Sequence, residues 1–338
     1  MKNLLIASTA LVATAGVAAA DVALSGRAEM GIFKTSGVDA QFFTDIDVTF
    51  TMSGETDNGL TFGASVDLDE GGAGAPAVAN NADDGGATIF ISGSFGTVTM
   101  GDTDGALDWA LTEAGNVGNP GSIADDETGH AGYLGSYADG SNDGQILRWD
   151  YTTGAFGVAI SVEDDNGSAV AGVSPGYAIG FKYAMDLGGT TVNLGLGYQK
   201  ADIIGTAKGF NNFLNGAGAL NTGDDVEIVG VSADATFANG ISAGISYAAH
   251  EFTIGGASID IDHIGLGVGY TTGALSLHMN YGQFDPDTAA LPDSAGFGLS
   301  AAYDLGGGAV IHAGYSRDDI DGSAFDFQRA SLGLGLSF

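Results

Sequence analysis

Apolar and polar positions alternate along most of this chain. In one stretch, Val192, Leu194 and Leu196 are separated by Asn193 and Gly195, and the chain closes on "SLGLGLSF" with the same spacing. A β-strand points successive side chains to opposite faces, so each such stretch has one apolar face and one small or polar face. The pattern predicts strands rather than helices.

Sixteen segments of the sequence are predicted as strands. They are 22–34, 40–54, 60–69, 86–93, 96–102, 144–152, 155–164, 176–186, 190–200, 225–237, 241–251, 258–271, 274–284, 295–304, 308–317 and 324–338. An even number lets an antiparallel sheet close into a barrel with both chain ends on one side. We therefore predict an all-β fold, a 16-stranded antiparallel transmembrane β-barrel.

The connectors between these segments alternate in length. After the even-numbered segments come tight turns such as "ETDNG", "TTGA" and "DLGGT", in which Gly and Asn supply the positive φ that short turns need. Several connectors after odd-numbered segments are long and polar: 70–85, 103–143, 165–175, 201–224 and 285–294. Short turns at one rim and long loops at the other are typical of an outer-membrane barrel.

Tyrosines mark both ends of the predicted apolar faces. Four of them precede long loops and four precede tight turns, and all share the apolar side of their strand: Tyr198, Tyr247, Tyr281, Tyr315, Tyr151, Tyr183, Tyr270 and Tyr303. Two aromatic rings at the two membrane interfaces are a feature of transmembrane barrels. The apolar face is therefore expected to contact lipid, and the last strand must pair with the first because hydrocarbon tolerates no open edge.

The N-terminal residues have the pattern of an export signal. Residues 1–20 combine Lys2, an apolar stretch and small residues, with Ala18 and Ala20 forming an A-x-A cleavage site before Asp21. We predict a signal peptide over 1–20 and a single barrel domain over 21–338.

The composition limits the kinds of partner that the chain is expected to bind. The formal net charge is −33, which disfavours nucleic acid and favours cations. A hydrophobic content of 44% argues against disorder despite this charge. The chain has no cysteine, so an exported fold cannot depend on disulfides, and its 5 prolines against 58 glycines suit a sheet.

Several stretches together resemble the general porins of alphaproteobacteria, similar to the Rhodobacter porins. They include "DVALSGRAEMGI", "VTFTMSGETDNGLTFGASVDL", "IFISGSFGTVTMGD", "QILRWDYTTGAFGVAISVEDD" and "AAYDLGGGAVIHAGY", and they extend over the mature chain. The resemblance implies a homotrimer in outer-membrane lipid and lipopolysaccharide, with a water-filled pore for small hydrophilic solutes in each barrel. It also implies an inward-folded third loop that narrows the pore, and a second loop, 70–85, that latches onto a neighbouring subunit.

Connector 103–143 matches the third loop of the resembling porins in position and length. Its only basic side chain is His130. The predicted constriction carries these acids: Asp102, Asp104, Asp108, Glu113, Asp125, Asp126 and Glu127. Carboxylate rings in a pore favour cations; a solvated surface loop is the alternative.

Strand parity places a few charged residues on the inner wall. The inward basic residues are Arg27, Arg148, Lys182 and Arg329, of which the first two are expected to form a cluster facing the acidic loop, as the resemblance implies. Asp45 and Asp47 also point inward, where the resembling porins tend to carry arginines. The expected field is dominated by negative charge, and cation preference follows.

Paired acids in the long loops suggest calcium, since clustered carboxylates with backbone oxygens suit this ion. The candidates are Asp83, Asp84, Asp125, Asp126 and Glu127. The alternative is mutual repulsion relieved by water and salt. No cofactor is required for passive diffusion.

Two other function classes are alternatives to the channel. A secreted, acidic, Gly-rich, Ca-binding β-protein or adhesin would use "GGAGAPAVA" as a calcium repeat, yet this stretch lacks the aspartate and does not recur. An enzyme would need a convergent set of catalytic groups. Ser276, His278 and Asn280 share one strand face, but neighbouring positions on one strand rarely supply the geometry of a nucleophile and its base. The chain is predicted not to be an enzyme.

Overall fold

A computed structural model describes residues 21–71, 86–135, 137, 145–164, 176–202, 224–289, 291–322 and 327–338. Its strands are β1 (Asp21–Thr35), β2 (Gln41–Glu55), β3 (Thr61–Gly71), β4 (Ala87–Gly93), β5 (Gly96–Gly101), β6 (Ile146–Thr153), β7 (Phe156–Glu163), β8 (Gly176–Asp186), β9 (Thr190–Asp202), β10 (Asp225–Phe237), β11 (Ile241–Ile254), β12 (Ala257–Thr272), β13 (Leu275–Pro286), β14 (Ser294–Gly306), β15 (Ala309–Ile320) and β16 (Gln328–Ser337). Between β5 and β6 lie the short helix α1 (Ala106–Ala110) and the 3-10 turns η1 (Ala114–Asn116) and η2 (Asp126–Thr128).

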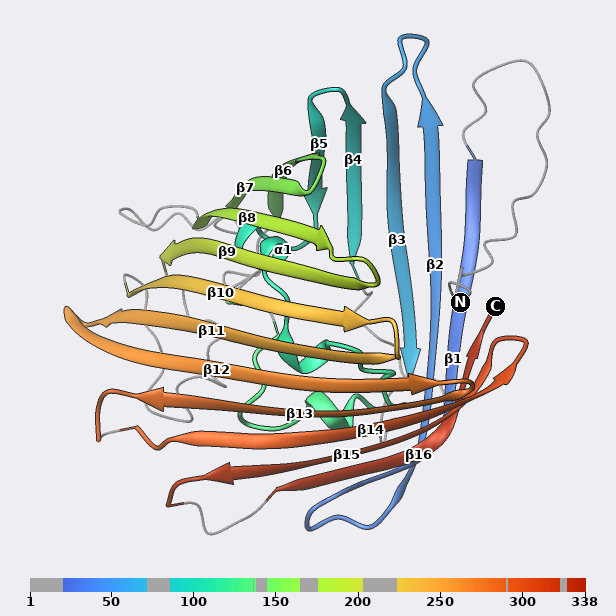
Figure 1. Cartoon of the computed structure of the whole chain (residues 1–338), viewed down its shortest axis with the longest axis vertical. Coiled ribbons are helices and arrows are strands. Elements are labelled where there is room, and N and C mark those ends of the chain that lie inside the picture. The colour runs from blue at the N-terminus through green and yellow to red at the C-terminus, as the bar shows by residue number, and fades with distance from the viewer. Residues whose placement is uncertain are drawn as a thin grey trace.

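The strands form one closed antiparallel barrel in chain order (Figure 1). Closure comes from β1 and β16, whose register pairs Gly31 with Gly333 and Ile32 with Leu332. The predicted 16-stranded antiparallel barrel is confirmed. Most predicted strand bounds agree within two residues; β11 and β15 extend three residues further, and β16 begins at Gln328 rather than at 324.

The outer face of the barrel is apolar. Large side chains remain exposed there, among them Leu24 (65%), Leu266 (40%) and Met279 (55%). A continuous exposed apolar surface of this kind needs a lipid or protein partner. Six of the eight tyrosines named above are also exposed on this face: Tyr151, Tyr183, Tyr247, Tyr270, Tyr281 and Tyr303. Within the described ranges, no helix is long and apolar enough to cross a membrane.

The inner face carries mostly small, polar and charged side chains, and a buried apolar cluster lies near the long-loop ends of β10–β13. There, Val226, Ile228, Phe252, Ile261 and Phe284 form a buried cluster with residues that precede β6 in the sequence. Those partners are Leu107, Leu111, Leu134 and Tyr137. This cluster fixes one side of the segment that joins β5 to β6.

Candidate functional site

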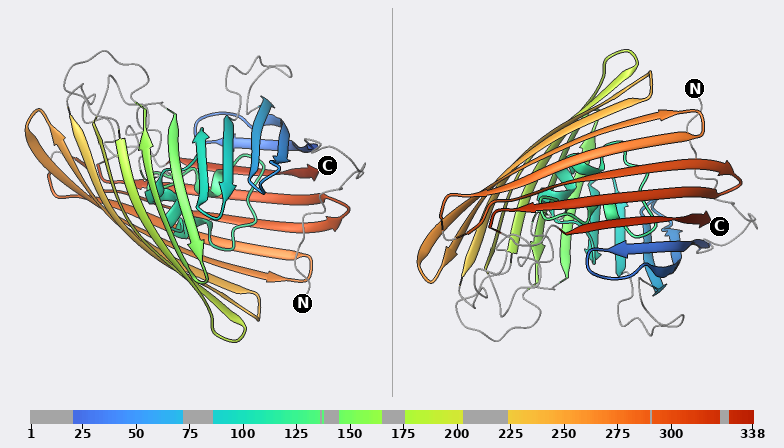
Figure 2. Two further views of the ribbon diagram at one scale, coloured as in Figure 1. Left: turned by 90° about the horizontal axis from the view of Figure 1, so that it is seen from above. Right: turned by 90° about the horizontal axis from the view of Figure 1, so that it is seen from below.

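The segment between β5 and β6, residues 102–135, is called the long loop below. Its short helices follow the wall in order, since α1 contacts β7–β9, η1 contacts β10–β13 and η2 contacts β13–β16. Both views of Figure 2 show these helices surrounded by the strands. β2–β5 have no such extensive contact with them, so the long loop leans towards one side of the barrel.

Polar side chains of the wall hold the backbone of the long loop. Ser161 accepts a hydrogen bond from the amide of Ala106 at 2.8 Å, and Ser232 accepts one from the amide of Thr112, also at 2.8 Å. Further along, the imidazole of His263 bonds the carbonyl of Gly132 at 3.0 Å. These partners satisfy backbone groups that would otherwise be buried without a hydrogen bond.

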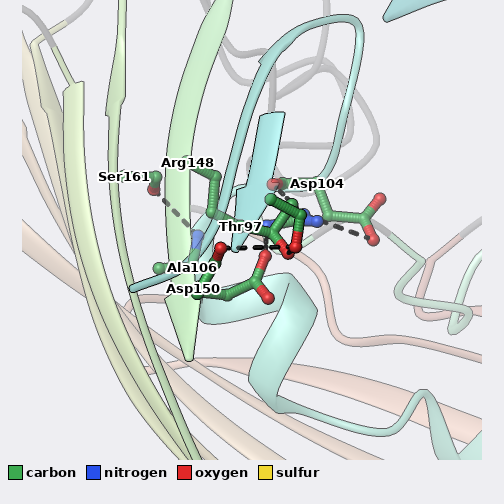
Figure 3. Close-up of polar contacts among 8 residues, drawn as sticks. Thr97, Asp104, Ala106, Arg148, Asp150 and Ser161 are labelled. Atoms are coloured by element: carbon green, nitrogen blue, oxygen red, sulfur yellow. Dashed lines mark hydrogen bonds and ion pairs between the residues drawn. The ribbon is translucent and has the colours of Figure 1, made fainter. Parts of the chain in front are cut away.

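Arg148 of β6 lies where the long loop leaves the wall (Figure 3). Its guanidinium donates to the backbone carbonyl of Asp104 at 2.6 Å and to the carboxylate of Asp150 at 3.3 Å. The Asp104 carboxylate is 4.0 Å away and largely exposed. Arg148 therefore holds the backbone of the long loop through a hydrogen bond and is also the counter-ion of two acids. Only 11% of its side chain is exposed.

The other inward cations are also engaged. The guanidinium of Arg27 pairs with the Glu29 carboxylate on the same strand. The ammonium of Lys182 lies 3.4 Å from the ring centroid of Trp109 in α1, a cation–π contact. Arg329 packs against Gly129 of the long loop.

The expected pairing of Arg27 with Arg148 as one basic cluster is not found, because β2–β5 separate their strands in the ring. The wall between them is acidic instead. Carboxylate oxygens of Asp45, Asp47 and Asp69 lie within 4.8 Å of one another, and Asp47 stands directly opposite Asp69 in the register of β2 and β3. Thr49 donates a hydrogen bond to Asp67 one step along the same face.

The acids of the long loop differ in their exposure to solvent. Asp102 and Asp104 are exposed, and Asp108 and Glu113 are half-buried. Burial raises the pKa of Glu113, against the opposing hydrogen bonds from Tyr133 and Asn116. Burial also raises the pKa of Asp125, helped by the neighbouring Glu127 carboxylate and opposed by Arg27.

Asp126 and Glu127 differ from the other predicted constriction residues. They are 0% and 1% exposed, and the Asp126 side chain lies against Gly314 of β15. Burial raises the pKa of Asp126 to about 6, while Asn119 donates a hydrogen bond to Glu127 at 2.9 Å. These two side chains are buried, so the pattern of acids overstated how many line open space.

The calcium candidates fit poorly. Asp83 and Asp84 lie outside the described residues. In the part of the chain that the structure describes, Asp125, Asp126 and Glu127 do not bring three ligand atoms together, and the one group of acids and histidines that does is Asp45, Asp47 and Asp69. We therefore derive no calcium site at 125–127.

The five histidines, which are far apart in the sequence, are all buried, four of them on the inner side of the barrel and His130 on the long loop. His130 bonds Asn280 at 2.7 Å, and His312 bonds the carbonyl of Gly121 at 3.0 Å. Burial lowers the pKa of His130, in the long loop, to about 4. The row of Ser276, His278 and Asn280 is thus used partly to hold the loop, with Asn280 donating to the carbonyl of Glu127 at 3.0 Å.

Comparison with known proteins identifies this arrangement. The sequence profile of the Gram-negative porins matches residues 7–323. The chain belongs to the Gram-negative porin family. A curated porin of Rhodobacter capsulatus is 34% identical over 325 residues, which cover 94% of this chain and all of that protein.

Solved porin structures agree with this assignment. A porin refined at 1.8 Å superposes with a TM-score of 0.70 at 29% identity, covering 94% of this chain and all of the other. A variant of Rhodopseudomonas blastica porin shares the fold, with a TM-score of 0.61 and 21% identity over the same shares. The chain is an outer-membrane porin, and the predicted resemblance is confirmed.

Several residues of the site were missed in the sequence. Asp67, Asp69 and Asp150 share the inward parity of their strands, so the alternation that selected Asp45 and Asp47 could also have found them. Trp109 gave no signal, because its partner Lys182 follows 73 positions later in sequence. The contact between them depends on the path of the loop.

Proposed function

We propose that this porin is a water-filled channel for passive diffusion of small hydrophilic solutes and ions, and that it prefers cations. One observation carries the proposal: acids stand both on the long loop, at Asp104, Glu113 and Asp125, and on wall strands that its helices leave uncovered. The wall acids are Asp45, Asp47, Asp67 and Asp69.

The inward cations do little to offset this charge. Arg27 and Arg148 are each paired with carboxylates, so their fields are largely neutralised locally. A pore lined by one sign of charge concentrates the opposite ion. The long loop narrows the pore in this proposal, since it occupies one side of the lumen.

A salt gradient across a planar bilayer tests the proposal directly. Refolded protein should insert as open channels with a reversal potential of the sign that marks cation permeation. An anion-selective reversal potential would refute the preference and leave the pore intact. Verified folded protein that inserts without conducting would refute the channel itself.

The remaining features of the proposal follow family membership. We expect a homotrimer, removal of residues 1–20 on export, and lipopolysaccharide around the outer leaflet. Three equal conductance steps per insertion would support the trimer, and an N-terminus at Asp21 would support cleavage. Membership of a channel family favours this reading over the secreted calcium-binding β-protein and over a barrel enzyme.

A further inference from the structure

Glycines occupy inward positions in register on neighbouring strands. Gly244 of β11 is the direct partner of Gly267 of β12, and Gly265 is the partner of Gly282. Following the register across the sheet gives two rows of mostly small residues: Ser232, Ser246, Gly265, Gly282 and Gly296, and Gly244, Gly267, Asn280, Gly298 and Ser316. Glycine weakens a strand interior and often marks close approach of another backbone.

These glycines lie beneath the long loop. A Cβ added to Gly267 would overlap the carbonyl oxygen of Ala114, and one added to Gly298 would overlap that of Glu127. On β8, a Cβ at Gly180 would overlap the carbonyl of Ala106. Because none of these three has a positive φ, the backbone conformation does not require glycine, and the space does.

The residues between the glycines supply hydrogen bonds. Ser232 and Asn280 belong to the two rows and bond the long loop, as described above. The wall therefore combines flat positions, where the loop backbone rests, with polar side chains, which fix its register. A barrel strand exposed only to water would have no need of this flatness.

We propose that the inward glycines of β8–β15 are positioning residues that seat the backbone of the long loop and so set the width of the pore. The contact between the glycines and the long loop does not depend on the proposed function. The effect of that contact on pore width rests on the proposed function. A side chain at a seat must push the loop into the lumen or release it. Either result changes the open cross-section.

Gly244 and Gly267 form a matched pair for a test. At Gly244 an added Cβ meets a side-chain atom, Cγ2 of Val117, at 2.6 Å, whereas at Gly267 it meets a backbone carbonyl. Val117→Ala removes the closest clash of Gly244→Ala and leaves the Cβ of residue 117 at 3.2 Å, a contact that a shift of a few tenths of an ångström relieves. The clash of Gly267→Ala is with backbone and cannot be relieved in this way. Gly26→Ala is the control, because its Cβ would lie 3.4 Å from the nearest atom, an ordinary contact.

The primary measurement is hydrogen–deuterium exchange of peptides covering residues 106–133, which does not depend on conduction. We expect exchange at least tenfold faster in Gly244→Ala and Gly267→Ala, with restoration by Val117→Ala only in the former. A change in gel mobility on heating verifies that each variant retains a closed barrel before it is heated. Val117→Ala alone serves as the reference for lost packing.

Single-channel conductance provides the second readout. Altered conductance in both variants, reversed by Val117→Ala only with Gly244→Ala, would support the seat and its effect on the pore. Faster exchange with unchanged conductance would support the contact between the glycines and the long loop, and would refute its effect on the width of the pore. Unchanged exchange in both variants, or no rescue of Gly244→Ala, would overturn the proposal.

Discussion

Replacing wall acids by their amides should weaken cation preference by a calculable amount. The three carboxylates of Asp45, Asp47 and Asp69 lie within 4.8 Å of one another on the inner wall. A monovalent ion about 5 Å from one carboxylate gains roughly 0.8 kcal/mol in a water-like dielectric. Screening in about 0.1 M salt reduces this to about 0.5 kcal/mol.

The effect on selectivity is twice that energy, because a carboxylate attracts the cation and repels the anion. Each acid therefore contributes about 1 kcal/mol to the difference, or about fivefold in the permeability ratio. Asp47→Asn should lower the cation-to-anion ratio by about fivefold. The triple change of all three residues should approach an upper limit of about 100-fold under the same assumptions.

Reversal potentials in a salt gradient measure this ratio, and matched variants isolate the cause. Asp319→Asn removes the same charge from the outer face of β15, where the side chain is exposed away from the lumen, so it should leave the ratio unchanged. Single-channel conductance in symmetric salt checks that the pore stays open. A triple variant with normal conductance and an unchanged reversal potential would refute the reasoning, because the charges could not then border the ion path.

Three further predictions follow. Arg27→Ala combined with Arg148→Ala should raise cation preference, since two positive charges leave the inner wall and Asp104 and Asp150 lose their counter-ion; an unchanged reversal potential and conductance would place both arginines away from the constriction. Burial lowers the pKa of His130 to about 4, so the stability that its neutral form contributes is complete above about pH 6.5 and is lost as pH falls towards 4, up to about 3 kcal/mol; unfolding of His130→Gln in denaturant should therefore depend less on pH over this window, and equal slopes would contradict the assignment. Leu266→Arg on the outer face should destabilise the barrel in lipid vesicles by about 2–4 kcal/mol and Tyr270→Arg by about 0–1 kcal/mol, because the cost of charge depends on membrane depth; equal costs would mean that this face does not contact lipid.

The barrel itself was predictable because its signal is local. Alternation of apolar and small residues requires only that successive side chains face opposite sides, and the strand order follows when each segment pairs with the next. Closure through β1 and β16 followed from the absence of tolerated edges in hydrocarbon. Agreement of nearly all strand bounds shows that little long-range information was needed.

The arrangement of the lumen was less predictable. The alternation along a strand shows whether a side chain points inward or outward, but it does not show which side chains lie beside it. Arg27 and Arg148 both point inward as predicted, yet β2–β5 separate them around the ring. Asp126 and Glu127 belong to an acidic stretch typical of solvated loops, but they are buried against the wall. The first error comes from treating shared parity as proximity, although strand order already separated the two residues. The second comes from contacts between the long loop and distant strands, which leave no periodic pattern in the sequence.

One trace of those contacts was present in the sequence. The stretches "LGLGY" (194–198) and "GLGVGY" (265–270) place glycine at successive inward positions. A lumen filled only with water would favour a polar residue such as Thr at such positions, since Thr suits a strand that glycine weakens. Glycine is favoured where another backbone must approach, so these glycines mark the wall positions that the long loop contacts.

The same path explains why the acids can dominate the pore. By resting on glycine from β8 to β15, the long loop keeps its helices against one side, and the uncovered wall of β2–β5 borders the remaining space. That wall carries Asp45, Asp47, Asp67 and Asp69, while its nearest cations, Arg27 and Arg148, lie at its two ends and are paired with other acids. The position of the loop and the sign of the pore's field are therefore linked: a loop released from its glycine seat would change the width of the passage and the distance of ions from these four carboxylates together.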